Sequence, residues 1–243
     1  MKELFVAWIL AMMSAVAPPH KFESAVTKEA RESVEDASAR YHDIAEDIVE
    51  AAFQEDVKPA FGGAQGRAKT AMMVATVFFM ESGFRRDVDL GTSHLRLRKT
   101  GLNDFGRSWC MGQHNLGWKM VPDPDREGGF VEDSTAKTAE GWTGRELLQN
   151  RKKCAIATIN KIRSSLGICR YLPRSDRLAL YARGRCISHS GQKISRTRVS
   201  LFDRWQKGRP DTPDSEMLAY LRGAEEEEDM SNAPTIFTSA VFR

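Results

Sequence analysis

Residues 78–84, Phe-Phe-Met-Glu-Ser-Gly-Phe, place a carboxyl group directly after a strongly apolar turn. Removal from water disfavours the charged form of a carboxyl group, so a glutamate in this position can carry a proton near neutral pH and donate it. Glu81 is therefore a candidate general acid. A glutamate at the end of a helix can also simply reach solvent, and its position alone favours this second interpretation.

Two later segments carry polar residues that can act together with Glu81. Residues 108–117 read Ser-Trp-Cys-Met-Gly-Gln-His-Asn-Leu-Gly, and residues 180–184 read Leu-Tyr-Ala-Arg-Gly. The order of these segments resembles the soluble lytic transglycosylase branch of the lysozyme-like superfamily. The order is a Glu-Ser-Gly-Phe segment, then a segment with a glutamine, and then a late Tyr-x-x-Gly. The resemblance covers roughly residues 66–205. It implies a mainly α, lysozyme-like domain at residues 57–205.

The resemblance implies roles for single residues. Glu81 matches the catalytic glutamate of the family, and Ser82 matches the serine that follows it and supports the site. Cys110–Gln113 matches a segment usually written Gly-Leu-Met-Gln, of which only the glutamine is kept. Gln113 and the neighbouring Met111 are therefore expected to face the glycan groove, and the departure from the family pattern concerns the shape of the groove more than the acid.

Two more positions extend the expected substrate site. Asn115 falls where the family often has a polar residue near the sugar. Tyr181 matches a late tyrosine that points toward the catalytic glutamate. The usual Ala-Tyr-Asn-x-Gly is here Leu-Tyr-Ala-Arg-Gly, a second departure from the family pattern. The expected substrate-binding residues are therefore Ser82, Met111, Gln113, Asn115 and Tyr181.

Cleavage of a glycosidic bond needs an acid on the leaving oxygen and a group that stabilises the oxocarbenium-like centre. Lytic transglycosylases lack the second carboxylate of lysozymes. The resemblance implies that the acetamido group of MurNAc assists, that Glu81 returns as the base and that a 1,6-anhydro ring forms. Asp87, Asp89 and Asp104 are the nearby acids that would instead make the chain a hydrolytic muramidase. Aspartate is also a common residue in loops and turns.

No metal and no organic cofactor is expected. His94 and His114 are near the site in the sequence, but two histidines without a third ligand in a metal-binding spacing do not form a metal site. Trp109, Trp118 and Trp142 can stack on sugars, although tryptophans in a domain of this size more often belong to the core.

The net charge is only +3, but the charge is distributed unevenly. Residues 22–60 carry eleven acids and four bases, a net −7, whereas residues 140–210 carry seventeen bases and four acids, a net +13. A basic half favours an anionic polymer or an acidic partner. An anionic cell wall explains it as well as nucleic acid does, and no nucleic-acid-binding motif is present, so nucleic acid is not expected as a partner. The basic residues considered are Arg151, Lys152, Lys153, Arg183, Arg185, Arg196 and Arg198.

The composition excludes several classes of protein. With 243 residues, of which 41% are hydrophobic and 28% charged, the chain is neither collagenous, nor wholly disordered, nor a multi-span membrane protein. Its length allows one sizeable domain with extensions or two small domains. The four cysteines form no Cys-x-x-Cys pair, which argues against a zinc site, and they allow three full disulfide pairings. Buried free thiols explain them equally well.

Hydrophobic periodicity places the candidate residues on helices. Residues 67–80 are apolar on almost every side, which predicts a buried helix that ends near Glu81. Helical periodicity returns over residues 144–166, and a shorter helix is predicted over residues 175–183. Residues 83–107 indicate an ordered loop or small lobe. The sequence shows no internal repeat and no clear alternating strand.

The two ends of the chain extend this domain. Residues 1–21 contain an apolar run with an Ala-x-Ala site, but the prolines that follow argue against cleavage, so we expect a signal-like segment or a docking helix. Residues 22–56 show one apolar seam at steps of three and four, which predicts a long acidic amphipathic helix. Residues 206–243 are expected to form a linker and an extended acidic tail.

Together with the resemblance, these features predict a peptidoglycan lytic transglycosylase that cleaves the MurNAc–GlcNAc β-1,4 bond with Glu81 as general acid and base. The expected partners are peptidoglycan glycan strands and, through residues 1–56 and the tail, other virion or envelope proteins. A bacteriophage virion component that degrades the wall locally from the periplasm during infection is the favoured setting, and an exported bacterial envelope enzyme is the alternative. A catalytically degenerate, lysozyme-like structural or glycan-binding component is the alternative function.

Overall fold

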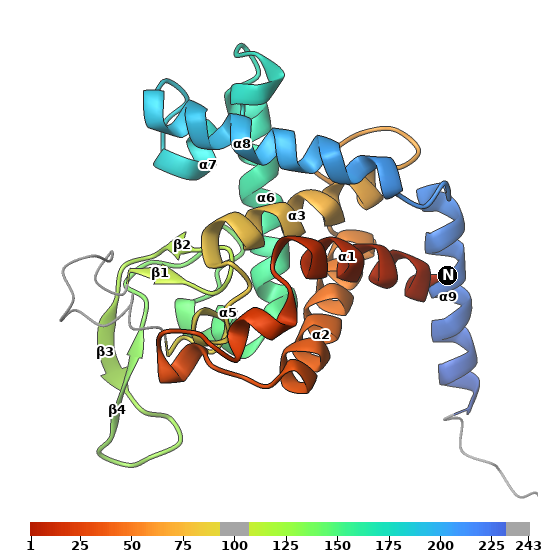
Figure 1. Cartoon of the computed structure of the whole chain (residues 1–243). Helices are drawn as coiled ribbons and strands as arrows, with labels where there is room; N and C mark the ends of the chain where they lie inside the picture. Colours follow the sequence, from red (N-terminus) through yellow and green to blue (C-terminus); the bar gives the residue numbers. More distant parts are fainter. Residues whose placement is uncertain (93–106, 232–243) are drawn as a thin grey trace, which may run out of the picture.

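The computed structural model describes residues 1–92 and 107–231, and the fold over these residues is mainly helical. This confirms the predicted fold class at the level of mainly α. Figure 1 shows the helices gathered around α3 (Gly66–Ser82), with short strands at one end of the molecule and α9 (Asp214–Ser231) at the other. His94 and Asp104 lie outside the described residues.

The helix α3 is buried because its sequence is apolar on almost every side. Its residues from Ala68 to Phe78, apart from Lys69, are closed off from solvent, and it packs against α1, α2, α6, α8 and α9. Gly83 ends the helix at φ 61°, a left-handed conformation that glycine adopts without the steric cost of a side chain. The helix predicted over residues 67–80 is confirmed, and Glu81 lies in its last turn.

The N-terminal helix α1 (Lys2–Val16) is part of the core. The Phe5 ring lies 5.1 Å from the ring of Phe53, and the Tyr41 hydroxyl donates a hydrogen bond of 2.8 Å to the carbonyl oxygen of Ala17, just after α1. The apolar side chains of α1 are therefore buried by packing against α2. No helix among the described residues is long and apolar enough to cross a membrane.

The helix α2 (Val34–Phe53) is shorter than the one predicted over residues 22–56. The Ser33 hydroxyl caps it by accepting a backbone hydrogen bond of 3.0 Å, which favours a helix start at this point. Val26, the first residue of the predicted seam, is 94% exposed, whereas the seam is buried from Ala37 onward. The preceding chain forms two short 3-10 turns, η1 (Pro19–Phe22) and η2 (Lys28–Ala30).

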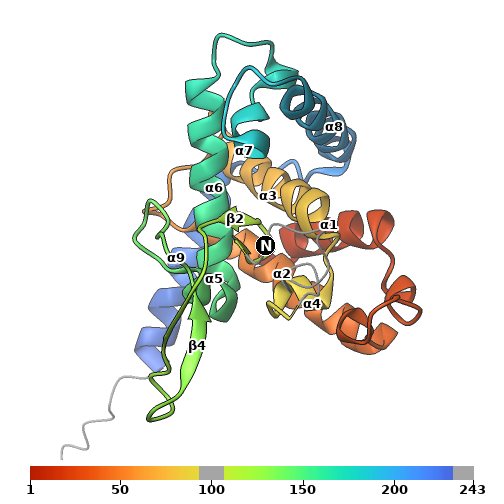
Figure 2. The same cartoon turned by 90° about the vertical axis from the view of Figure 1, so that its left-hand side faces the viewer.

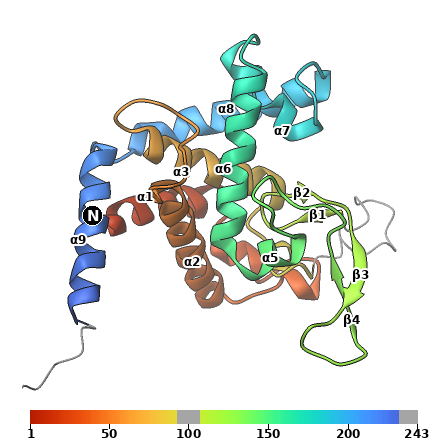
Figure 3. The ribbon, with the colours of Figure 1, turned by 180° about the vertical axis from the view of Figure 1, so that it is seen from behind.

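Two antiparallel ribbons follow the gap in the described residues. The strand β1 (Ser108–Trp109) pairs with β2 (His114–Asn115), and β3 (Lys119–Pro122) pairs with β4 (Phe130–Asp133). The sequence predicted no strand, because runs of two to four residues are too short to show alternation. Figures 1 and 3 show the ribbons at the opposite end of the molecule from α9.

All four cysteines form disulfides, so the free-thiol alternative is wrong. The bonded pairs are Cys110–Cys154 and Cys169–Cys186. The first bond attaches the turn between β1 and β2 to α6 (Arg151–Ile168), and the second attaches the end of α6 to the segment before α8 (His189–Trp205). Both bonds therefore tie chain segments to one helix.

The segment predicted as helical over residues 144–166 forms two helices, α5 (Gly144–Gln149) and α6. Asn150 separates them, because its side chain accepts a hydrogen bond of 2.9 Å from the backbone N–H of Lys153 and so caps α6. Figure 2 shows α6 running from α5 at its start to the loop that leads to α7 (Ala179–Arg183).

Beyond α6 the structure is more helical than predicted. The helix predicted over residues 175–183 is divided into η4 (Arg174–Asp176) and α7. The helix α8, which packs on both α3 and α7, has no counterpart among the predicted elements. Its buried side carries Gly191, Ser195 and Arg198 in addition to the apolar residues Val199, Leu201 and Phe202.

The segment predicted as a linker and extended tail, residues 206–243, contains η5 (Gln206–Gly208) and α9. Met217 is fully buried, and the Asp214 carboxylate accepts backbone hydrogen bonds of 2.7 and 3.3 Å at the start of α3, where a negative charge complements the helix dipole. One hydrophobic cluster thus contains residues of all four predicted segments, among them Phe5, Ile48, Val74 and Met217.

Candidate functional site

Glu81 is held at the end of α3 by a tightly bonded turn. The Ser82 hydroxyl donates a hydrogen bond of 2.6 Å to the carbonyl oxygen of Phe78 and accepts one of 3.1 Å from the backbone N–H of Phe84. The buried Phe84 ring packs 5.6 Å from that of Tyr41. Ser82 therefore fixes the backbone beside Glu81, and its hydroxyl is fully engaged there.

The Glu81 carboxylate forms an ion pair with Arg198 of α8. The side chain of Glu81 is 23% exposed, whereas that of Arg198 is 2% exposed. Arg198 Nη2 donates to Glu81 Oε1, but Nε and Nη1 are closed off from solvent and have no hydrogen-bond partner among the residues that the structure describes. Arg198 is therefore a buried cation whose hydrogen-bonding capacity is only partly used.

Lys161 of α6 and Tyr181 of α7 complete this site. Lys161 Nζ lies 4.2 Å from the centroid of the Tyr181 ring, and Arg198 Cζ lies 5.0 Å from the same centroid. Both distances are within the range of cation–π attraction. We call Glu81, Lys161, Tyr181 and Arg198 the Glu81 cluster; Figure 1 shows the end of α3 beneath α7 and α8, close to α6.

Burial dominates the electrostatics of the cluster. It lowers the pKa of Lys161, while the Glu81 carboxylate opposes this effect and Arg198 adds to it. It raises the pKa of Tyr181 well above the usual range, and the negative charge of Glu81 adds to this effect. Tyr181 is therefore a neutral hydrogen-bond donor, and the cluster combines two basic side chains with a single carboxylate.

The turn between β1 and β2 contacts the cluster through its backbone. The Tyr181 hydroxyl donates a hydrogen bond of 2.7 Å to the carbonyl oxygen of Gly112. A Cβ atom on Gly112 would lie 2.3 Å from Thr158 Oγ1, so only glycine fits here. Gln113 closes its own turn, with Nε2 donating a 2.9 Å hydrogen bond to the carbonyl oxygen of Cys110, and Met111 is buried.

The two residues of β2 differ in their surroundings. Asn115 is exposed and pairs with Ser108 across the ribbon. His114 is buried, and its Nε2 lies 3.0 Å from Thr158 Oγ1. Burial lowers the pKa of His114 to about 3, so its imidazole is neutral at physiological pH.

The structure brings the predicted site residues together to different degrees. Glu81 and Tyr181 both contact Arg198. Gln113 and Met111 lie in the turn that bonds Tyr181, but their side chains are directed to the turn and the core. Ser82 bonds the backbone of α3, and Asn115 is exposed on the ribbon.

The sequence motifs did not indicate Lys161 as a site residue, and Arg198 was considered only among the basic residues. A signal for both exists in the spacing of polar residues on helix faces that are otherwise buried. The face of α6 toward the core carries Cys154, Thr158, Lys161 and Ser165. The corresponding face of α8 carries Gly191, Ser195, Arg198 and Phe202.

The short helix α4 (Arg86–Asp89) carries two of the acids considered as a second catalytic carboxylate. Asp87 is buried and forms an ion pair with Arg85. Asp89 is 3% exposed and accepts hydrogen bonds of 2.9 and 3.0 Å from Arg151 Nε. Both carboxylates are therefore held by arginines.

Asp89 belongs to a second charged group, which lies mainly on the polar face of α2. Arg151 Nη1 also lies 3.7 Å from Asp43, and Lys2 Nζ lies 2.7 Å from Glu50 and 3.4 Å from Glu46. We call this group, with Lys2, Arg151 and Lys152 as its cations, the acidic cluster. Its carboxylates belong to Asp43, Glu46, Asp47, Glu50 and Asp89.

Asp47 is the most perturbed member of the acidic cluster. Burial raises its pKa to about 6 against the opposing charge of Arg151, and the neighbouring carboxylates of Glu50, Asp43 and Asp89 add to the increase. A carboxyl group with such a pKa exchanges its proton near neutral pH.

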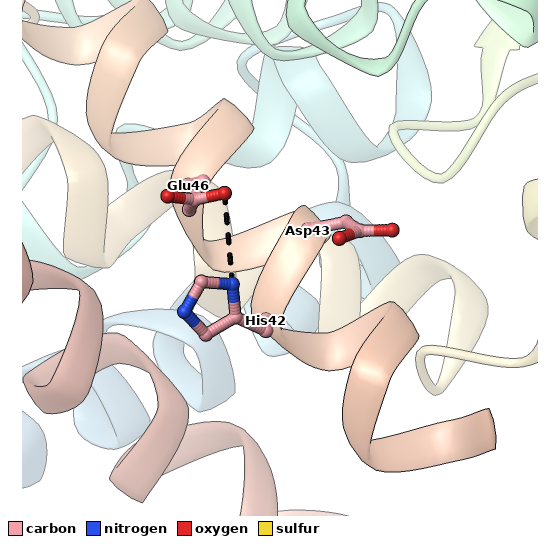
Figure 4. Close-up of side chains that lie close together, drawn as sticks. All are labelled: His42, Asp43 and Glu46. Atoms are coloured by element: carbon pink, nitrogen blue, oxygen red, sulfur yellow. Dashed lines mark ion pairs between the residues drawn. The ribbon is translucent and has the colours of Figure 1, made fainter. Parts of the chain in front are cut away.

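Figure 4 shows a potential metal-binding group on α2, formed by His42, Asp43 and Glu46. Their ligand atoms lie within 4.8 Å of one another, and His42 Nδ1 lies 3.5 Å from Glu46 Oε2. His42 and Asp43 are exposed, and the two carboxylates are already paired with Lys2 and Arg151. We assign no ion to this group.

The tryptophans and the remaining basic residues have separate roles. Trp109 is buried, and its Nε1 donates a hydrogen bond of 2.7 Å to the carbonyl oxygen of Gly117. Trp142 is partly buried, with Lys153 Nζ 5.5 Å from its ring centroid. Arg183 and Arg185 are exposed. The other basic residues considered in the sequence form ion pairs; they are Arg151, Lys152, Lys153, Arg196 and Arg198.

Comparison with known proteins does not add a family to this geometry. No family model, no curated protein and no solved structure matches the chain. The chain is therefore defined by its own features, which are a mainly helical fold, two disulfides and an internal charged cluster that reaches solvent at Glu81.

Proposed function

We propose that this chain is a peptidoglycan lytic transglycosylase with a lysozyme-like domain, in which Glu81 is the general acid and base. The proposal is carried by one observation. Glu81 and Tyr181, one hundred residues apart in the sequence, both contact Arg198 in a cluster that is open to solvent at the glutamate. These are the two residues that the order of the sequence motifs assigned to one site.

The proposed reaction uses Glu81 twice. Glu81 gives a proton to the oxygen of the leaving GlcNAc as the bond between C1 of MurNAc and that oxygen breaks, and the acetamido oxygen stabilises C1. The 6-hydroxyl of the same MurNAc then bonds to C1 and returns its proton to Glu81. No water is consumed, and the product carries a 1,6-anhydro ring. The ion pairs of Asp87 and Asp89 support this over hydrolysis, because both acids are engaged by arginines.

The ion pair with Arg198 sets a condition for this reaction. Glu81 Oε1 is occupied by the hydrogen bond that it accepts from Arg198 Nη2, so this oxygen cannot contact a substrate at the same time. Glu81 must therefore leave Arg198 before it carries the proton that the acid step needs. The same ion pair favours a second candidate function, a catalytically degenerate glycan-binding or structural component in which the ion pair is permanent.

The two disulfides support a setting outside the reducing cytosol. Disulfides persist in the periplasm, on virions and outside cells, where oxidising conditions maintain them. We propose a virion-associated enzyme that opens the cell wall locally during bacteriophage infection, with an exported bacterial envelope enzyme as the alternative. The partners are glycan strands and, through residues 1–56 and the C-terminal tail, other proteins of the particle or envelope. Detection of the chain in purified particles, rather than in the envelope of uninfected cells, distinguishes these settings.

The function is tested by mass spectrometry of the fragments that the full chain releases from purified peptidoglycan. The wild type should release anhydro-muropeptides, and Glu81→Gln should release none. Glu127→Gln is the matched control, because it makes the same change at an exposed position in the turn between β3 and β4 and should retain the wild-type rate.

Each other result assigns a different function. Muropeptides with reducing ends, from the wild type only, identify a hydrolytic muramidase. Equal release by the wild type and Glu81→Gln removes Glu81 from the chemistry. Binding to the wall without any release by the wild type identifies the glycan-binding or structural component.

A further inference from the structure

The end of α6 and the segment before α8 form a tip with large exposed apolar side chains. The disulfide Cys169–Cys186 joins the two segments, with a Cα–Cα distance of 5.5 Å. Ile168 and Ile187, the neighbours of the two cysteines, are 61% and 72% exposed, and Tyr171 is 63% exposed. Single exposed apolar residues are ordinary, but three large ones beside one disulfide form a patch.

The same tip carries three exposed arginines. Arg170, Arg183 and Arg185 lie within three residues of the disulfide. Within residues 1–92 and 107–231, none of them has a carboxylate oxygen within 4.0 Å of its side-chain nitrogens. Asp176 and Asp203, the acidic residues between positions 164 and 205, are already paired with other arginines. We use the name basic tip for the exposed side chains of Ile168, Arg170, Tyr171, Arg183, Arg185 and Ile187.

The basic tip lies away from the acidic part of the molecule. Figures 1 and 3 both show the end of α6, with α7 and the start of α8, at the top of the molecule, whereas α2 lies below them. Residues 164–205 carry nine bases and two acids, a net +7, whereas residues 22–60, which include α2, carry a net −7. An anionic surface therefore attracts the tip and repels α2, so the uneven charge orients the molecule.

We propose that the basic tip binds the surface of an anionic lipid bilayer. The arginines are attracted to the negative headgroups, and each basic residue near such a surface strengthens binding about fivefold. The apolar side chains are stabilised at the boundary between headgroups and acyl chains, where a tyrosine is also favoured. The phosphate backbone of a nucleic acid offers no apolar layer to Ile168 and Ile187, so the combination of charge and apolar surface favours a bilayer. The inference is independent of the proposed reaction, because no residue of the tip belongs to the Glu81 cluster.

The inference is tested by sedimentation of the full chain with lipid vesicles. One set of vesicles contains phosphatidylglycerol and phosphatidylcholine in equal parts, and the other contains phosphatidylcholine alone. We expect the chain to bind the mixed vesicles at least about tenfold more tightly, and this binding should weaken as salt is added. A DNA duplex carries phosphate charge without an apolar layer. At the same phosphate concentration it should leave most of the chain on the mixed vesicles.

The charged part of the contact is tested by a double variant. Arg183→Gln with Arg185→Gln removes two cations from the tip, so the affinity for mixed vesicles should fall about twentyfold. Lys119→Gln with Arg126→Gln is the matched control, because it removes the same charge from exposed positions in β3 and in the turn that follows it. The control should bind the mixed vesicles like the wild type.

The apolar part of the contact has its own pair of variants. Ile187→Ser removes exposed apolar surface from the tip, so the affinity for mixed vesicles should fall about fivefold. Val26→Ser makes a similar change at a position that is 94% exposed and lies outside the tip, and it should bind like the wild type.

Each result supports or overturns the inference. Equal binding to the two kinds of vesicle, or an equal loss of affinity in the two double variants, overturns the basic tip as the site of contact. Wild-type affinity in Ile187→Ser, or displacement of the chain by the DNA duplex, assigns the tip to a soluble polyanion and overturns the bilayer. Loss of affinity in the tip variants only, without displacement by the duplex, supports the inference. None of these results depends on the release of wall fragments, so the proposed function is tested separately.

Discussion

The Glu81 cluster and the acidic cluster use the same kinds of side chain in opposite proportions. In the acidic cluster, five carboxylates meet three cations, and each cation has a carboxylate oxygen within 3.7 Å. In the Glu81 cluster, two basic side chains meet one carboxylate. Within residues 1–92 and 107–231, Lys161 has no ion pair and Arg198 uses one of its nitrogens. In the first arrangement every cation is paired, whereas in the second a buried guanidinium keeps two nitrogens without a partner among the described residues.

The comparison is tested most strongly by removing the central arginine of each cluster. Arg151→Met leaves Asp89 buried without its cation and beside other carboxylates, so the free energy of unfolding should fall by about 3–5 kcal/mol. Arg198→Met leaves Glu81 partly in solvent and also removes two unsatisfied donors, so the loss should be at most about 1 kcal/mol. Urea unfolding of both variants at the same pH measures the difference.

Lys152→Met is the control for this pair of variants. Its ammonium group is partly exposed and lies 3.5 Å from Glu50, so its removal should cost about 1 kcal/mol or less. If Arg198→Met is as destabilising as Arg151→Met, then Arg198 is a structural cation, and the contrast between the two clusters is lost.

The disulfides sharpen the comparison, because the bond Cys110–Cys154 holds a turn that contacts the Glu81 cluster. It attaches the turn that contains Gly112, the acceptor of the Tyr181 hydroxyl, to α6. Replacement of both cysteines by alanine should lower the free energy of unfolding by about 2–4 kcal/mol. Hydrogen exchange should increase in residues 110–117 and in α7.

Hydrogen exchange in α2 and α3 is the internal reference for that variant. These helices contact each other in the core and carry no cysteine, so their amide protons should keep most of their protection. Equal loss of protection in α2 would show that the disulfide stabilises the whole fold and not the Glu81 cluster in particular.

The sequence predicts the helices of this fold best where one face is clearly apolar. The buried helix over residues 67–80 and the apolar seam from Ala37 onward are confirmed, because hydrophobic periodicity is a direct consequence of burial on one or all sides. Helix α8 was not predicted although Val199, Leu201 and Phe202 lie on its buried side. The start of α2 was missed because Ser33, rather than the seam, determines it.

The candidate site was only partly predictable for a related reason. Glu81 and Tyr181 lie in short segments whose residue types indicate chemistry, and they meet on Arg198. Lys161 lies in a helix interior, where a single lysine is ordinarily a surface residue. Its place beside Tyr181 depends on how α6, α7 and α8 pack, and this packing joins residues that are distant in the sequence.

The stability of the fold should depend on pH with opposite signs at two residues, His114 beside Thr158 and Asp47 in the acidic cluster. His114, whose imidazole contacts Thr158 of α6, has a pKa of about 3 when folded because of burial, against about 6.5 when unfolded. Between these values the unfolded chain binds more protons, so stability falls as the pH falls. From pH 8 to pH 5 this residue should remove about 2 kcal/mol, and His114→Gln should remove that part of the slope.

The measurement for His114 is urea unfolding of the wild type and His114→Gln at pH 8, 6.5 and 5. The variant lowers stability at pH 8 if it loses the contact with Thr158, but its change between pH 8 and pH 5 should be smaller than that of the wild type. A variant with the same pH slope as the wild type would show that another group titrates in this range. His42→Gln, at an exposed position on α2, serves as the control.

Asp47 of the acidic cluster should show the opposite sign and the smallest effect. Burial and neighbouring carboxylates raise its pKa to about 6, so the folded chain binds more protons than the unfolded chain between about pH 4 and pH 6. The stability from this group is therefore present at low pH and is lost as the pH rises through 6. Asp47→Asn, which resembles the neutral form, should be more stable than the wild type at pH 8, by less than about 1 kcal/mol because the side chain is only half-buried.

Asp43→Asn distinguishes this effect from a general reduction of negative charge. Asp43 is exposed and lies 3.7 Å from Arg151, so its replacement removes the same charge from the same helix without removing a burial cost. Thermal unfolding at pH 8 and pH 4 should show a gain for Asp47→Asn at pH 8 only and no gain for Asp43→Asn at either pH. An equal gain in both variants would mean that the excess of carboxylates in the acidic cluster, and not the burial of Asp47, lowers the stability of the fold at pH 8. The contrast with the Glu81 cluster would then be weaker, because repulsion between carboxylates would outweigh their pairing with cations.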